Sequence, residues 1–190
     1  MLANRPIYII PGSQITKERR IEIFGGSVTG GGSLKPENYQ RKAIEEGIGI
    51  PCVKTNIRIN LRTSEMQEIA HPNKQNDGFD FSEDFDGVQT INNTKIYYNL
   101  KCIVGDGGNQ TRSLREVYSF VEAQHKIAQT KKHNVYFVNI LDGDVCAKHM
   151  AKFNDYQKNL PQYSNNNNIY VGDLYNYFAW FNTVILPAVN

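Results

Sequence analysis

The chain has 190 residues, of which 40% are hydrophobic, and its formal net charge is only +2. This length is sufficient for one domain with a sizeable core, and no apolar run approaches the length of a membrane span. The N-terminus lacks a signal-peptide core, so we expect a cytoplasmic protein without membrane contact. The three cysteines lack paired spacing, which favours reduced, buried thiols over a disulfide or zinc framework. Because the chain is not strongly basic, DNA binding would depend on local clusters of charge.

The first part of the chain is predicted to be an N-terminal segment, residues 1–34, in front of a domain formed by residues 35–190. A short apolar piece, Ile7–Ile10, is strand-like and is broken by Pro11-Gly12. The glycine-rich stretch Gly25–Ser33 is flexible by composition. It lacks the Gly-Lys-Ser/Thr ending of a phosphate-binding loop, so nucleotide binding there is not favoured.

Three elements are expected between this segment and the middle of the chain. Pro36–Glu46 is predicted to be a helix, because Pro36 suits the first helical position and Gly47 a C-terminal stop. Pro51–Leu61 is strand-like, with alternating apolar residues. Ser64–Ala70 is predicted to be a short helix with Ser64 as its N-cap.

A β-hairpin is expected next, with Phe79–Ile91 as its first strand and Lys95–Val104 as its second. Asn92-Asn93 is the turn signal, because asparagine tolerates positive φ better than most residues.

Pairing back from a two-residue turn sets Asp86 opposite Asn99 and Asp84 opposite Lys101. Since side chains alternate along a strand, Asn99 and Lys101 share one face, and Leu100 lies on the other.

The remaining elements alternate between helix and strand. Ser113 with Glu116 forms a capping box at the start of a long helix, and an apolar run predicts a strand buried on both faces. The expected elements are a helix over Ser113–Gln129, a strand over Val135–Leu141, a helix over Ala147–Phe153, a strand over Ile169–Val171 and a helix over Asp173–Val184. This order predicts an α/β (α+β) fold with a mixed central β-sheet flanked by helices.

Asp86 followed by Asn99-Leu100-Lys101 on the next strand resembles the active-site motif of the PD-(D/E)XK nuclease superfamily, and in particular of type II restriction endonucleases. The family pattern is Asp, a variable gap, then an acid, any residue and Lys. Here Asn99 stands where the family has the middle acid, and Phe85 stands where it often has proline. The resemblance implies the αβββαβ core of that superfamily, which agrees with the order of elements above.

The chemistry expected at this motif is metal-assisted phosphodiester hydrolysis with Asp86, Asn99 and Lys101 as catalytic residues. A divalent ion can activate a water and stabilise charge on the phosphate, and Mg²⁺ prefers oxygen ligands. Mg²⁺ is therefore the expected cofactor, with Mn²⁺ as a substitute. Asp86 is the primary ligand, Asn99 offers a neutral amide oxygen, and Lys101 orients the attacking water.

Further ligands are expected around this set. The resemblance implies that the backbone carbonyl of Leu100 reaches the metal, and Asp84 is the backup carboxylate. An acid from a preceding helix is common in the family, and Glu45 and Glu46 are the candidates. For Glu45 and Glu46 the competing interpretation is that a glutamate at a helix end is solvated.

Two groups of polar residues are candidates for DNA contact. The first lies at the start of the long helix, where backbone N–H groups and arginines suit phosphates; the second alternates along one strand and could read base edges. The first group is Gln110, Thr111, Arg112 and Arg115, and the second is Asn56, Arg58, Asn60 and Arg62. Ordinary capping and solvated surface charge are the competing interpretations.

The sequence therefore predicts a Mg²⁺-dependent endonuclease that cuts a short duplex sequence, as a homodimer for both strands of a palindrome. A cognate DNA methyltransferase is a partner to look for. One alternative is a catalytically inert DNA-binding module of the same fold, with Asn99 as the lost acid. Another is a small-molecule enzyme that uses Asp142 and Asp144 at the end of a buried strand, or the glycine-rich stretch.

Overall fold

A computed structural model describes residues 9–24, 34–68, 82–105, 108–130, 134–165 and 167–190. The glycine-rich stretch Gly25–Ser33, together with residues 69–81, lies outside the described residues. The helical elements are η1 (Gly12–Gln14), α1 (Lys17–Phe24), α2 (Leu34–Ile48), α3 (Gly108–Gln129), α4 (Asp144–Lys158), α5 (Leu174–Trp180), the π-helical turn η2 (Phe181–Ile185) and α6 (Leu186–Val189). The strands are β1 (Ile57–Asn60), β2 (Glu65–Glu68), β3 (Ser82–Asp84), β4 (Gly87–Ile91), β5 (Thr94–Cys102), β6 (Val135–Asp142) and β7 (Ile169–Gly172).

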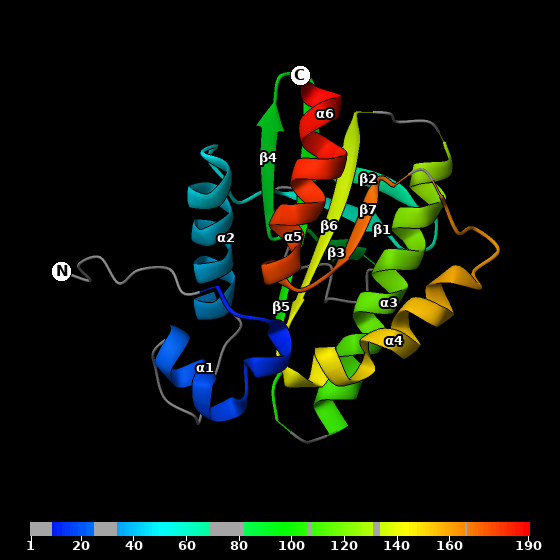
Figure 1. Ribbon diagram of the computed structural model, residues 1–190. Helices are drawn as coiled ribbons and strands as arrows, with labels where there is room; N and C mark the ends of the chain where they lie inside the picture. The colour runs from blue at the N-terminus through cyan, green and yellow to red at the C-terminus, as the bar shows by residue number, and fades with distance from the viewer. Residues whose placement is uncertain (1–8, 25–33, 69–81, 106–107, 131–133, 166) are drawn as a thin grey trace, which may run out of the picture.

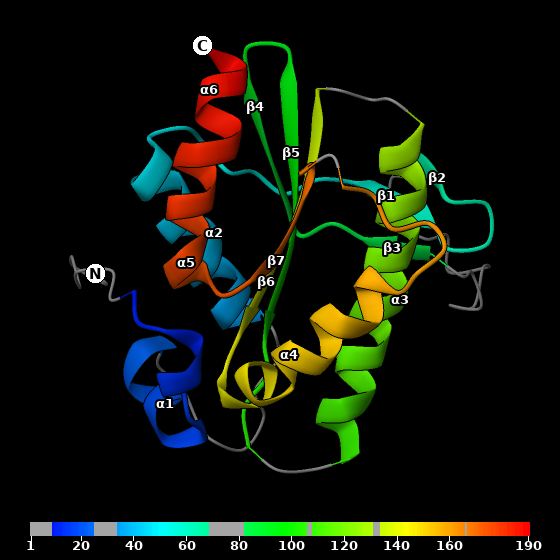
Figure 2. The ribbon, with the colours of Figure 1, turned by 45° about the vertical axis from the view of Figure 1, so that its right-hand side comes forward.

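The central sheet is mixed, as expected, and has the strand order β4-β5-β6-β7. β4 and β5 form an antiparallel hairpin, while β6 and β7 add to it in parallel. Figure 2 shows α2, α5 and α6 on one side of this sheet and α3 and α4 on the other. The predicted α/β architecture with helices on both faces is therefore confirmed.

The hairpin has the predicted register. Ile91 pairs with Thr94 and Gly87 with Tyr98, which sets Asp86 beside Asn99. Asn92 has a φ of 53°, the left-handed conformation that asparagine tolerates at a turn. The turn residues therefore determine which side chains meet at the other end of the hairpin.

Apolar side chains bury both faces of the central sheet. Ile96, Tyr98 and Leu100 of β5 pack with α2 and α5 in one core cluster. Tyr97 of the same strand faces the other way, and it packs with Phe120 of α3 in a second cluster. β6 is buried along nearly its whole length, as its continuous apolar run predicts.

Three strands form a second, antiparallel sheet in the order β2-β1-β3. The predicted strand Phe79–Ile91 is wrong as a single element, because the chain leaves β3 at Asp84 and starts β4 in the central sheet at Gly87. The strand predicted for Pro51–Leu61 is shorter in the structure and covers only Ile57–Asn60. Val53 forms a single β-bridge to Val88.

The helix predicted for Ser64–Ala70 is also wrong, because Glu65–Glu68 forms strand β2. The Asn60 side chain accepts hydrogen bonds from the backbone N–H groups of Arg62 and Thr63, and Ser64 has a φ of 56°. These features close a turn after β1, and β2 then pairs with that strand.

Ile9 and Ile10, the described part of the strand-like piece Ile7–Ile10, do not lie in a strand. After them, Gly12 begins a short 3-10 turn and Lys17–Phe24 forms helix α1. The Gly12 N–H donates to the Asp173 carboxylate at 2.8 Å. The capping box at Ser113 is wrong as well, because α3 begins at Gly108 and the Ser113 hydroxyl bonds to the Asn109 carbonyl inside the helix.

Candidate functional site

The passage from β3 to β4 places Asp86 at a break between the two sheets. Phe85 is 2% exposed and packs against the rings of Phe120 and Phe137. Its N–H donates to the Ile57 carbonyl in the second sheet, whereas the Asp86 N–H donates to Tyr98 in the central sheet. The chain therefore changes sheets between these two residues, and Asp86 stands at the open end of the hairpin.

The Asp86 carboxylate and the Lys101 ammonium meet at this break. Lys101 Nζ lies 3.9 Å from Asp86 Oδ2, and the same oxygen accepts a hydrogen bond from the Leu100 N–H at 2.7 Å. Arg41 of α2 donates to the Asp86 backbone carbonyl at 3.0 Å. The structure thus brings together two of the three predicted catalytic side chains, and Arg41 is a supporting residue that the sequence did not reveal.

Burial controls the electrostatics of this pair. Desolvation raises the pKa of Asp86 to about 6, against the lowering effects of the Lys101 charge and the Leu100 hydrogen bond. Burial also raises the pKa of Glu83, which interacts electrostatically with Lys101 and with Asp86. Glu37 of α2 adds a further negative charge near Asp86. Several carboxylates therefore surround one lysine, and the charge of Lys101 is the largest factor that lowers the pKa of Asp86 and of Glu83.

A pocket with a volume of about 280 Å³ opens beside Lys101. The end of β5 and the first turns of α2 and α3 surround it, all in the lower half of Figure 1. Glu37, Arg20 and Gln110 line this pocket with Lys101. Gln110 Oε1 is buried and has no hydrogen-bond partner among the described residues. The pocket thus combines two cations, a carboxylate and an unpaired amide oxygen.

Asn99 belongs to a buried cluster of amides. It is 1% exposed, and its amide N–H donates to Asn139 Oδ1 at 3.2 Å. Asn139 in turn exchanges hydrogen bonds with Gln124 of α3 at 2.7 and 3.0 Å. The Asn99 NH₂ group is therefore committed to contacts between β5, β6 and α3, and the role of its Oδ1 as a metal ligand stays a prediction.

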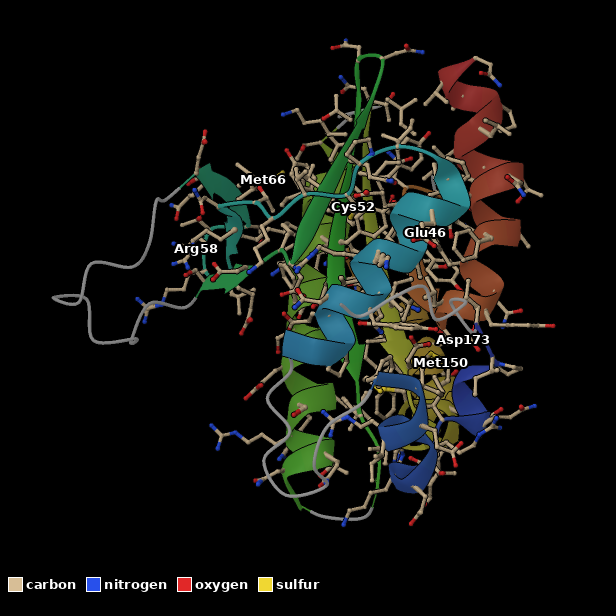
Figure 3. All side chains as sticks on the ribbon, turned by 90° about the vertical axis from the view of Figure 1, so that its left-hand side faces the viewer. Glu46, Cys52, Arg58, Met66, Met150 and Asp173 are labelled. Atoms are coloured by element: carbon tan, nitrogen blue, oxygen red, sulfur yellow. The ribbon has the colours of Figure 1, made fainter. Side chains whose placement is uncertain are left out.

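The backup acids are also misplaced. Asp84 belongs to β3, where it pairs with Arg58 in the second sheet instead of lying opposite Lys101. Glu45 lies near the C-terminal end of α2 and accepts a hydrogen bond from the Cys52 N–H at 3.1 Å. Glu46, labelled on α2 in Figure 3, forms an exposed ion pair with Lys42. The acid that α2 directs toward Asp86 is Glu37, eight residues before Glu45.

The predicted DNA contacts on the second sheet are corrected in part. Arg58 is 7% exposed and forms an ion pair with Asp84, so its guanidinium is not free to read a base. The Asn60 side chain closes the turn after β1. Asn56 and Arg62 remain exposed. Figure 3 shows Arg58 on the second sheet, away from the label of Cys52 near the central sheet.

The first turns of α3 divide the other predicted contacts between two sides of the helix. Gln110 lines the pocket beside Lys101, whereas Thr111 and Arg115 line a separate groove toward α4. Arg112 is exposed and pairs with Glu116 at 3.3 Å. Only Gln110 of this group therefore lies at the candidate site itself.

At the end of β6, the two carboxylates of the alternative acidic site accept hydrogen bonds from other parts of the protein. Asp142 is 2% exposed, and its two oxygens accept hydrogen bonds from Gln40 Nε2 and the Leu174 N–H. Asp144 accepts a hydrogen bond from the Gly105 N–H at 3.2 Å. Both carboxylates therefore link segments of the fold. The cysteines are free thiols, and burial raises the pKa of Cys52 and of Cys146 to about 12, so both stay protonated.

Within the described ranges, no three Asp, Glu, His or Cys side chains come together as a metal-binding group. The predicted Mg²⁺ ligands, Asp86 with the Asn99 amide oxygen and the Leu100 carbonyl, include only one such side chain and stay a prediction. The groups near Lys101 do offer oxygen donors, and Mg²⁺ is commonly held by one or two carboxylates and substrate phosphates. By donor chemistry, Asp86 with Glu37 or Glu83 fits such an ion.

Comparisons with models of protein families, with curated proteins and with solved structures gave no match to this chain.

Proposed function

We propose that the protein is a DNA endonuclease that hydrolyses phosphodiester bonds at the pocket beside Asp86 and Lys101. One observation carries the proposal: Lys101 lines a pocket bordered by the first turn of α3, and its ammonium lies 3.9 Å from the largely buried Asp86 carboxylate. The Asp86…Lys101 spacing and the helix–hairpin–helix–strand order support the proposal through the resemblance to the PD-(D/E)XK superfamily, although only two strands of the central sheet precede α3. The homodimer and the methyltransferase partner belong to the same proposal.

The side chains at this site have complementary tasks. Lys101 is one-third exposed, so its ammonium can reach a phosphate oxygen and stabilise the negative charge that develops there. Asp86, held by the Leu100 N–H, keeps the ammonium in place and can accept a proton from water. The N-terminal N–H groups of α3 suit a neighbouring phosphate.

Mg²⁺ is the proposed cofactor, with Asp86 and either Glu37 or Glu83 as its protein ligands. When bound, the ion would supply a more acidic water and neutralise charge on the phosphate.

The test is cleavage of a long duplex DNA with Mg²⁺ or Mn²⁺ by the wild type, Lys101→Ala and Asp86→Ala. We expect discrete fragments from the wild type and a loss of at least about 100-fold in rate for each variant. Lys95→Ala is the matched control, because Lys95 is an exposed lysine at the other end of the same strand. Absence of cleavage with both ions, or unchanged cleavage by Lys101→Ala, would contradict the proposal.

The second candidate is a catalytically inert DNA-binding module, and the position of Asn99 favours it. The residue that the family pattern makes acidic is here an amide buried with Asn139 and Gln124. Retained DNA binding by wild type that cleaves under no metal condition would support this candidate over the enzyme.

A further inference from the structure

A second concave site lies between α3 and α4, on the helix layer seen at the right of Figure 2. Its volume is about 360 Å³, within the usual range for small-ligand sites of roughly 300–1,000 Å³. Leu114 and Phe153 are buried at its base, while Tyr118 and Tyr156 form its walls. The Tyr156 side chain is 51% exposed, which is unusual for a large apolar group. We call this site the aromatic groove.

The aromatic rings of the groove are oriented edge to face. Tyr118 contacts Phe153 at 5.5 Å and Tyr156 at 6.4 Å between ring centroids, with interplanar angles near 80°. The Tyr118 hydroxyl donates to the Tyr156 backbone carbonyl at 3.2 Å, which ties α3 to α4. The groove is thus built from two connected helices, with the half-exposed Tyr156 at its wall.

The charged groups that line the aromatic groove are all basic. Arg115 and Lys152 line it together with His149, and Lys152 Nζ lies 5.6 Å from the centre of the Tyr156 ring. The carboxylate next to Tyr118 is Glu122, which pairs with Lys126. A ligand with a flat apolar part and a negative charge therefore complements this surface.

The aromatic groove adjoins the proposed cleavage pocket through α3. Gln110 and Ser113 line the pocket, whereas Thr111, Leu114 and Arg115 line the groove, so one helix start borders both. A chain of alternating phosphates and bases can follow this helix start from one site to the other.

We propose that the aromatic groove binds an unstacked base of a DNA strand, with adjacent phosphates at Arg115 and Lys152. Three features favour a DNA strand as the ligand: the exposed Tyr156, the basic side chains that line the groove, and helix α3, which borders both the groove and the pocket. The inference rests on the proposed function, because the same DNA strand would pass Lys101. Aromatic rings accept any base by stacking, so the groove provides affinity without sequence preference.

The experiment measures binding of a fluorescently labelled oligothymidylate by anisotropy, with chelator present to prevent cleavage. Tyr156→Ala should weaken binding by roughly 5- to 150-fold, which corresponds to the loss of one stacked base. Tyr156→Phe should bind like wild type, because stacking does not need the hydroxyl. Tyr175→Ala is the matched control, since Tyr175 on α5 is 52% exposed, on the opposite side of the sheet.

A second variant, Arg115→Gln with Lys152→Gln, should reduce the salt dependence of binding, because each lost phosphate contact lowers the slope. Equal binding by Tyr156→Ala and wild type would overturn the inference. So would a change in self-association upon that substitution without a change in DNA affinity, since a second copy would then be the occupant.

The binding and cleavage assays together separate this inference from the proposed function. If Tyr156→Ala loses affinity for the oligonucleotide while Tyr156→Phe and Tyr175→Ala keep it, the groove is supported whether or not the wild type cleaves. If the wild type cleaves duplex DNA and Tyr156→Ala binds normally, only the groove is overturned. If the wild type neither binds nor cleaves DNA, both proposals are overturned.

Discussion

Asp86 and Asp142 are buried carboxylates at ends of strands in the same sheet, and burial raises the pKa of both to about 6. They differ in their partners. Asp142 is 2% exposed, and each of its carboxylate oxygens accepts a hydrogen bond, one from Gln40 and the other from the Leu174 N–H. Asp86 receives one hydrogen bond from the Leu100 N–H and faces Lys101, and its side chain is 16% exposed. Burial and a raised pKa therefore do not distinguish a structural carboxylate from a candidate catalytic one, whereas the set of partners does.

The largest effect expected from this comparison is on stability at Asp142. An isosteric Asp142→Asn side chain has one oxygen and one NH₂ group, so it cannot accept from both Gln40 and Leu174. Leaving a buried donor unsatisfied should lower the free energy of unfolding by about 2–3 kcal/mol. Urea denaturation at pH 7 measures this loss, with the exposed Asp155→Asn on α4 as a control. Equal stability of the two variants would show that Asp142 is not a structural bridge.

The next effect concerns Asn99, which the family pattern would make acidic. An Asn99→Asp carboxylate would face Asn139 Oδ1, now the acceptor of the Asn99 amide, and would be buried. We expect a loss of about 2 kcal/mol at pH 8. The loss should be smaller at pH 5, because burial raises the folded-state pKa of the new acid above its unfolded value, and stability is then lost as pH rises.

Denaturation at the two pH values checks this prediction, with Asn93→Asp at the exposed hairpin turn as a control. The contrary result would be a stable Asn99→Asp variant with greater Mg²⁺-dependent cleavage. Position 99 would then be a vacated ligand position, in agreement with the inert-module alternative.

Local sequence features predicted the parts of the site that depend on a single hairpin. The Asn92-Asn93 turn and the alternation along β5 were sufficient to place Asp86 beside Asn99 and near Lys101. Asp84 could not be placed in the same way, because the change of sheets at Phe85 depends on an aromatic cluster with residues from α3 and β6. Periodicity does not report such contacts.

The contribution of Glu37 and the fate of Asn99 are likewise tertiary. In sequence, Glu37 is an ordinary acid in a first helical turn, and only the packing of α2 on β5 brings it near Asp86. Asn99 is an amide at a motif position, and its commitment to Asn139 and Gln124 requires β6 and α3. A short segment at Glu65–Glu68 carried too little pattern to distinguish helix from strand, and pairing with β1 decided it.

The third prediction uses the pKa of Asp86 to test its role in cleavage. If the ionised carboxylate is required, the rate should be constant well above pH 6 and should fall about tenfold for each pH unit well below it. Cleavage rates between pH 5 and 8 measure this profile, and circular dichroism at pH 5 controls for unfolding. A rate that does not change between pH 5 and 7 would exclude a requirement for ionised Asp86.

The smallest expected effect concerns the stability of Asp86→Asn, and its sign is opposite to that at Asp142. The folded-state pKa of Asp86 is raised from 3.8 to about 6, so its stabilising contribution is present below pH 3.8 and is lost as pH rises through 6. A shift of this size corresponds to roughly 3 kcal/mol as an upper bound. Removing the desolvated charge should stabilise the fold, but the substitution also weakens the bond from Leu100 and leaves Lys101 without its carboxylate. We therefore expect Asp86→Asn to gain only about 1 kcal/mol at pH 8.

At pH 4 the same variant should match the wild type, because the wild-type carboxyl is then largely protonated. Thermal or urea unfolding at pH 4 and pH 8 gives the two differences, and Asp142→Asn, which should be destabilised at pH 8, is the internal comparison. A gain in stability together with loss of cleavage would mean that the ionised Asp86 is kept at a cost to the fold, as expected of a functional group. A loss of stability at pH 8 would instead make Asp86 a structural carboxylate like Asp142.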